Sequence, residues 1–278
     1  MGINKLVLYF FIMQPLLVAS KIDPAGYGMA DYLIERYAFH RIDNDLEVYS
    51  NSTVDLLLVE QEALTLDWLD SKFSPEYYVF LSKHRSESGI PTLTCHTTGN
   101  FSDSNEMGGK PKELAYAYPS LQKHYMRTLW KERARIPDYQ LAIEATHHGP
   151  TSLAKPALFI EIGSSEKQWG DKNAVAVVCD TIINTIKNLM KYSKIGIGLG
   201  GTHYPSKFTQ LLIDSDFAIA SVASKHSLPY IDRPMLKQMI SKSIEDVRYV
   251  FMDWKGLGKE KDRLNDIVND LGLEVMKL

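Results

Sequence analysis

Residues 157–199 read ALFIEIGSSEKQWGDKNAVAVVCDTIINTIKNLMKYSKIGIGL and contain two kinds of hydrophobic pattern. The apolar runs at 157–163 and 194–199 are typical of short strands that are buried on both faces. In the segment 173–192 between them, apolar and small residues recur every three or four positions, which gives a helix one core-facing stripe. The order strand, helix, strand predicts a unit in which two parallel strands are joined by a helix.

The same alternation continues on both sides of this unit. Further strands are predicted at 15–20, 55–60, 77–82, 92–96, 139–145 and 216–222, and further helices at 25–38, 119–135, 206–213, 234–245 and 259–271. We therefore predict an α/β fold, a three-layer sandwich whose central sheet is mostly parallel and covered on both faces. These elements fall within residues 15–278, which we expect to form a single domain.

The overall composition excludes several classes of protein. A formal net charge of -3 on 278 residues gives no general attraction to nucleic acid, so any RNA contact must come from a local basic surface. The two cysteines, Cys95 and Cys179, are far apart and not in CxxC spacing. This argues against a disulfide-rich secreted domain and against a zinc site made of thiolates.

The N-terminal residues superficially resemble a signal peptide, because one lysine precedes an apolar run at 6–18. The run is too short for a membrane span, and Gln14-Pro15 interrupts it. Cleavage near Ala19 would remove the strand predicted at 15–20. We interpret residues 1–14 as an apolar extension, or as the product of a start codon placed too early, of a cytoplasmic protein that does not bind membranes.

Histidines lie at or just after the ends of several predicted strands. Because the carboxyl ends of parallel strands meet at one edge of a sheet, side chains that follow them gather there. Five of the eight histidines are in such positions, namely His84, His96, His147, His148 and His203. We expect these five imidazoles to lie together at one edge of the sheet.

The segment 144–150, EATHHGP, places one carboxylate and two imidazoles in the loop after a strand. Neutral imidazole is a common zinc ligand, and two or three such ligands plus a water make an open catalytic site. Adjacent residues of an extended chain point to opposite faces, so we expect only one of His147 and His148 to reach a given metal. The other could act as an acid–base group or bind a second ion. The alternative is two loop histidines that bond only to backbone.

Glu161 lies within an apolar strand, and buried carboxylates are rare unless they are paired. It is therefore a candidate metal ligand, or a partner that orients a ligating histidine. His96 ends the strand at 92–96 and, taken alone, is equally well explained as a satisfied core histidine. We predict metal binding by His96, His147, His203 and Glu161. The predicted catalytic residues are His147, His148 and Glu144.

The segment 195–205, IGIGLGGTHYP, is rich in glycine, which permits close approach of backbone or exposes amide N–H groups to an oxyanion. Its literal G-x-G-x-x-G match is weak, because the first glycines lie inside the strand and Pro205 interrupts the expected helix start. No lysine follows, so a phosphate-binding P-loop is excluded. Close packing of strand against helix is the alternative. We expect substrate contacts from His84, Gly198, Gly200, Gly201 and Thr202.

The segment 110–135 is strongly basic, with seven Lys or Arg residues against two Glu residues, and it contains three tyrosines and a tryptophan. Such a segment can follow an RNA backbone and stack on an unpaired end. A solvated helix face is the alternative. We predict contacts with tRNA from Lys123, Arg127, Lys131 and Arg135.

Together these segments resemble the archaeal and plant type of D-aminoacyl-tRNA deacylase, a zinc-dependent family distinct from the bacterial D-Tyr-tRNA deacylases. The matching stretches, in the order of the family, are SKIDPAG (20–26), SKHRSESGIPTLTCHTTGN (82–100), EATHHGPTS (144–152), FIEIGSSEKQW (159–169) and GLGGTHYPSKFT (198–209). The resemblance implies a fold related to peptidyl-tRNA hydrolase and nucleoside phosphorylases, and a monomer that binds zinc, with two ions per subunit. It also implies hydrolysis of the ester that joins a D-amino acid to the tRNA 3′ end.

Two other functions remain open at this point. A nucleoside phosphorylase-like enzyme would use the glycine segment and depend on phosphate but not on a metal. A non-catalytic tRNA-binding protein would still bind tRNA after loss of His147 and His148. A Ser-His-Asp hydrolase has no support, because the chain contains no G-x-S-x-G motif.

Overall fold

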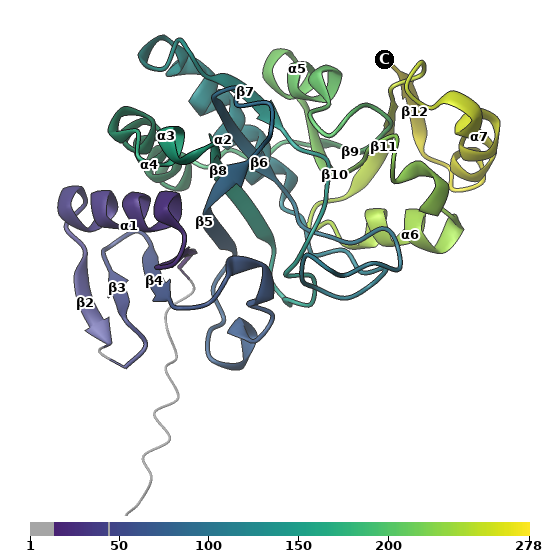
Figure 1. Cartoon of the computed structure of the whole chain (residues 1–278). Coiled ribbons are helices and arrows are strands. Elements are labelled where there is room, and N and C mark those ends of the chain that lie inside the picture. The colour runs from purple at the N-terminus through teal and green to yellow at the C-terminus, as the bar shows by residue number, and fades with distance from the viewer. Residues whose placement is uncertain (1–13, 44) are drawn as a thin grey trace, which may run out of the picture.

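The computed structural model describes residues 14–43 and 45–278, which contain two β-sheets and the helices that pack on them (Figure 1). The large sheet has eight strands, in the spatial order β2 (His40–Asp43), β3 (Val48–Ser50), β4 (Asp55–Val59), β1 (Leu16–Ser20), β5 (Tyr78–Arg85), β8 (Ala157–Ser164), β6 (Thr92–His96) and β7 (Gln140–Ile143). The small sheet has four parallel strands, β10 (Phe217–Ala223), β9 (Lys194–Leu199), β11 (Val247–Met252) and β12 (Glu274–Lys277).

Except for the short helix α3, which was not predicted, the helices agree with the amphipathic segments of the sequence. They are α1 (Pro24–Arg36), α2 (Pro119–Lys131), α3 (Glu166–Trp169), α4 (Lys172–Lys187), α5 (Ser206–Asp214), α6 (Arg233–Ser241) and α7 (Lys261–Asn269). Asp23 begins α1 and Asp171 begins α4, because each side chain accepts hydrogen bonds from two backbone N–H groups of the first turn. The predicted helix 119–135 is shorter than expected, since α2 ends at Lys131 and the 3-10 helix η3 (Arg133–Arg135) follows.

The α/β class and the mostly parallel central sheet are confirmed. The strand–helix–strand unit predicted at 157–199, however, does not form two neighbouring strands of one sheet. Strands β8 and β9 are both present, yet they belong to different sheets. Helix α4 packs with α1 and α2 on the large sheet, while β9 pairs with β10 and β11. The periodicity of a segment shows which face is buried and not which strand becomes its neighbour, so the sequence could not distinguish these arrangements.

Four strands were not among those predicted. The reason is compositional: β2, β11 and β12 contain charged residues that interrupt an apolar run, and β3 is only three residues long.

The two faces of the large sheet are covered differently. On one face, residues such as Leu17, Leu56 and Ile160 pack against α1, α2 and α4. On the other face, Val18 and Phe159 pack against the segment 63–73, which contains only short 3-10 helices. The large sheet thus has α-helices on one face only. The small sheet has them on both faces, as predicted, because it lies between α5 and the pair α6 and α7. The face of the large sheet without α-helices is where the candidate site is built.

The strand predicted at 15–20 is present as β1, and the same buried cluster contains residues of both sheets, such as Leu17 and Phe251. The interpretation of residues 1–14 as an extension concerns positions that, except for Gln14, lie outside the described residues. Within the part of the chain that the structure describes, no helix combines the length and the apolar character that a membrane crossing requires.

Candidate metal centre and active site

The site is built around Glu161, in the middle of β8. Alternation along the strand places Phe159 and Glu161 on the face that carries no α-helix. Glu161 lies between two histidines from the neighbouring strands. Its Oε2 atom is 3.1 Å from Nδ1 of His84 at the end of β5, and its Oε1 atom is 3.7 Å from Nε2 of His96 at the end of β6. The buried carboxylate is therefore paired, as its position in an apolar run predicts.

The predicted histidines do converge, but not along one edge of the sheet. Strand β6 runs antiparallel to β8, so His96 lies beside Phe159, whereas His84 lies beside Gly163. The ends of β5 and β6 are thus staggered along β8, and the prediction of a single edge of parallel strands is wrong. The imidazoles meet because their side chains share one face of the sheet, not one edge.

Glu144 follows β7 and connects the pair His84 and Glu161 to His203, which belongs to another segment. Its Oε1 atom is 3.2 Å from His84 Nδ1, and its Oε2 atom is 2.7 Å from His203 Nε2. The main chain holds these segments together, because Glu144 N–H donates to the carbonyl of Cys95 and Ala145 N–H donates to that of His203. His203 follows β9, so the small sheet contributes directly to the site.

His147 and His148 both point toward His96, with ring centroids 4.3 Å and 4.8 Å from its own. The extended chain assumed in that expectation is not present, and the geometry allows both rings to face one candidate metal position. His148 has a φ of 47°, in the left-handed region that non-glycine residues rarely occupy. Such strain is typical of functional sites. Nδ1 of His147 lies 2.8 Å from the carbonyl of Ala145, a contact that suits an Nδ1–H donor and a free lone pair on Nε2.

Three overlapping groups of side chains within the described residues have the geometry of a metal site. They are His96, His147 and His148; Glu144, His147 and His203; and His84, Glu144 and Glu161, with ligand atoms within 4.8 Å of one another in each group. His96 Nε2 and Glu144 Oε1 are buried and lack a hydrogen bond of normal geometry to any described residue. Imidazole nitrogens and carboxylate oxygens are the donors that zinc uses. The residues present therefore fit zinc.

The electrostatics of the cluster favour the metal-binding protonation states of His147, His148 and both carboxylates. Burial lowers the pKa of His148 to about 4 and that of His147 well below its usual value, and the charge of His96 acts in the same direction. Burial raises the pKa of Glu161, but the hydrogen bond from His84 and the nearby imidazole of His96 outweigh it, so this pKa is lowered. The pKa of Glu144 is lowered too, since the hydrogen bond from His203 outweighs burial. In His84 and His96 burial lowers the pKa, but the neighbouring Glu161 outweighs it and both pKa values are raised. A metal at His96 would therefore displace a proton there, whereas neutral His147 and His148 and the ionised carboxylates are ready to coordinate a cation.

Beside the cluster lies an open pocket of about 330 Å³, which we call the rim pocket. It is lined by His147 and His148, by residues of the segment 99–107 and by His226, Ser227 and Tyr230. The residues at 226–230 could not be found from the sequence, because they form no motif and lie next to the histidines only in the folded chain. Sequence reasoning also missed Tyr204, whose hydroxyl is hydrogen-bonded to His84 Nε2. The only signal for Tyr204 was its position next to His203.

The glycine segment is explained partly by packing. A Cβ atom on Gly198 would lie 3.0 Å from the ring of Phe208 on α5, which is the close strand–helix packing that the sequence left open. Gly200 and Gly201 have φ values of 101° and 81°, which glycine adopts without strain. Contact of these residues and of Thr202 with substrate stays a prediction.

The basic segment is divided by the fold. Lys123 is fully buried, and its Nζ donates to the carbonyls of Leu212 and Ser215 at the end of α5. Its predicted contact with tRNA is therefore wrong, since the periodicity of α2 turns this lysine toward the core. Arg127 is half-buried, while Lys131 and Arg135 are exposed at the end of α2.

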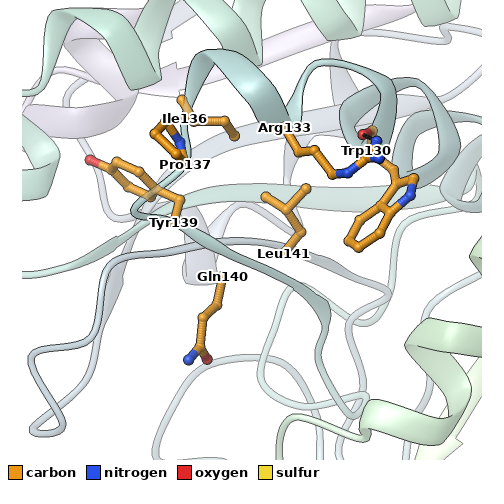
Figure 2. A pocket seen from close by; sticks show the side chains of 7 residues that line it. All are labelled: Trp130, Arg133, Ile136, Pro137, Tyr139, Gln140 and Leu141. Carbon is orange, nitrogen blue, oxygen red and sulfur yellow. Dashed lines mark hydrogen bonds between the residues drawn. The ribbon is translucent and has the colours of Figure 1, made fainter.

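A second pocket of about 470 Å³ opens beside these basic residues. Figure 2 shows the side chains that line it, which come from the end of α2, from η3 and from the start of β7. Arg133 lies over the ring of Trp130, with its guanidinium carbon 4.7 Å from the ring centroid. A partly exposed aromatic ring and several cationic side chains thus share one surface.

Comparisons with known proteins show the family of this chain. A family model described as D-aminoacyl-tRNA deacylase matches residues 71–276. This chain is 38% identical to the D-aminoacyl-tRNA deacylase of Cenarchaeum symbiosum and 34% identical to that of Pyrococcus furiosus. Each match covers 94% of this chain and 98% of the relative. A crystal structure described as that of a conserved protein of unknown function is 28% identical, with a TM-score of 0.90 over 96% of each chain. This chain therefore belongs to the D-aminoacyl-tRNA deacylase family.

Proposed function

We propose that this protein hydrolyses the ester between a D-amino acid and the 3′ end of tRNA, with zinc as its cofactor. The observation that carries the proposal is the convergence of five imidazoles and two buried carboxylates beside an open pocket, in a chain of this family. The product would be a free D-amino acid and reusable tRNA, which amounts to quality control of translation. Such a substrate is made in the cytoplasm, so we propose that location, and we expect a monomer.

The zinc ligands in this proposal are His96, His147, His203 and Glu161, with Glu144 and His148 close enough to complete two neighbouring sites. When bound, zinc would polarise the ester carbonyl or lower the pKa of a water molecule toward neutrality.

The protein's own side chains then have separate tasks. His147 is oriented by its Nδ1 contact with the carbonyl of Ala145, so that Nε2 faces the cluster. Glu161 fixes the ring of His84 in the same way. Glu144 Oε2 lies 2.7 Å from His203 Nε2, so this carboxylate can orient the His203 ring. Glu144 can also accept a proton from the attacking water and give it to the leaving ribose oxygen.

The test compares D-tyrosyl-tRNA with L-tyrosyl-tRNA as substrates, before and after chelation and after zinc is added back. We expect rapid loss of the D-ester only, abolished by the chelator and restored by zinc. If the lifetime of the D-ester is the same with and without protein in every condition, the proposal is wrong. Phosphate-dependent turnover of nucleosides would favour a phosphorylase, and tRNA binding without cleavage would favour a non-catalytic protein.

We further propose that Arg127, Lys131 and Arg135 bind the tRNA phosphates. Arg127 and Lys131 are four residues apart on α2, so they lie near one another on one face of the helix. Arg135 is partly neutralised by Glu132 and Asp180.

The double variant Arg127→Glu, Lys131→Glu is expected to raise KM for D-aminoacyl-tRNA by about tenfold and to weaken its dependence on salt, because phosphate contacts release bound counterions. Steady-state kinetics at several salt concentrations would measure both effects. Lys259→Glu, at another exposed position, serves as the control. An equal KM for the double variant and this control would remove the assignment.

A further inference from the structure

We infer that the rim pocket binds the adenine ring of the substrate's 3′-terminal adenosine, and that Tyr230 is the surface on which this base stacks. The inference rests on the proposed function, because it names which part of the aminoacyl-tRNA enters the pocket. The first step is adjacency. His147 and His148 line the pocket and also belong to the candidate metal groups, so an ester held at the cluster has one of its two substituents in the pocket.

The second step concerns the size and chemistry of the pocket. A volume of about 330 Å³ is large enough for a nucleobase with part of its ribose. Most of the lining side chains are polar, among them Asn100, Ser102, Ser104, His226 and Ser227. Hydroxyl, amide and imidazole groups match the hydrogen-bonding edges of a base. The terminal adenosine is the same in every tRNA, whereas amino-acid side chains differ, so a fixed polar lining suits the base better.

The third step concerns Tyr230 itself. Its side chain is 48% exposed, although it lies on η4 (Leu228–Tyr230) between two fully buried anchors, Leu228 and Ile231. The turn is held by main-chain hydrogen bonds from Tyr230 N–H to Ser227 and from Ser227 N–H to Ser224. An exposed aromatic ring on a rigid turn is a ready stacking surface for an unpaired base.

Two charged residues lie nearby, Glu106 in the lining of the pocket and Lys225 next to a lining residue in sequence. Lys225 is exposed and directly precedes the lining residue His226. A cation at this position can meet the phosphate on the 5′ side of the terminal adenosine. Phe101, which is 4% exposed, forms part of the apolar floor of the pocket.

The experiment measures kcat and KM for Tyr230→Ala with two substrates, D-alanyl-tRNA and D-tyrosyl-tRNA. We expect KM to rise about tenfold for both, because the lost stacking partner is the same adenine in each. Tyr230→Phe keeps the ring and should retain most of the affinity. The control is Tyr27→Ala, which removes another exposed tyrosine, on α1.

A binding measurement separates this inference from the proposed function. By calorimetry, adenosine 5′-monophosphate should bind the wild type more tightly than cytidine 5′-monophosphate, and Tyr230→Ala should lose that preference. A rise in KM confined to D-tyrosyl-tRNA would place the amino-acid side chain in the pocket and overturn the inference, as would unchanged values with both substrates. If the wild type cleaves neither ester, the proposed function fails, and the nucleotide measurement alone decides the role of the pocket.

Discussion

Replacing His147 by alanine is expected to lower kcat for D-aminoacyl-tRNA hydrolysis about a thousandfold, the largest effect of any single change in the site. His147 belongs to two of the three candidate metal groups found among the described residues, so its loss would disturb two neighbouring coordination sites. The magnitude is that expected when a group acting directly on the reacting atoms is removed. The variant should also hold less zinc per chain, which elemental analysis of the purified protein measures.

The matched control for this variant is His40→Ala, because His40 is exposed on β2, outside the cluster. It should keep both full zinc content and full kcat. If His147→Ala retained the zinc content and kcat of the wild type, His147 could be neither a ligand nor a catalytic residue, and the candidate metal groups would have to be reassigned.

Phe159→Ala is expected to lower the free energy of unfolding by about 3–5 kcal/mol, the usual loss for a fully buried phenylalanine. Phe159 is fully buried, and its ring centroid lies 4.6 Å from that of Phe80 and 5.5 Å from that of His96. The cavity left by the ring would therefore open next to a predicted zinc ligand. Weaker zinc binding should accompany the loss of stability.

Denaturant unfolding of Phe159→Ala, with and without zinc, measures both effects. Phe159→Leu is the control, because leucine retains much of the volume and should cost less. A loss below about 1 kcal/mol in the alanine variant would show that the surrounding side chains close the cavity, and that Phe159 does not support His96.

The candidate metal-ligating residues could be predicted from the sequence because each departs from the local hydrophobic pattern. Glu161 interrupts an apolar strand, and a buried carboxylate needs a partner wherever the strand is placed. The pair His147 and His148 follows a strand and precedes Gly149-Pro150, so the chain must turn there whatever surrounds it. These features depend on the residues themselves and on their immediate neighbours.

The arrangement of the strands could not be predicted in this way. Strand β6 alternates and is buried like a strand of a parallel sheet, and nothing in its composition shows that it runs antiparallel to β8. Nothing in the composition of β8 and β9 indicates that they belong to different sheets either. Strand partners and directions are set by hydrogen bonds and packing between distant segments, which local periodicity does not report.

Thus the sequence by itself determined the α/β class, the positions of the described α-helices other than α3, the chemical nature of the candidate metal donors and the family. Only the tertiary structure decided that His147 and His148 face the same histidine, since that depends on one left-handed residue. It also decided that Lys123 binds carbonyls at the end of α5 instead of facing RNA, and that Tyr230 stands beside the cluster. The physical reason is that burial and backbone period are local properties, whereas the neighbours of a side chain are fixed only when remote segments pack together.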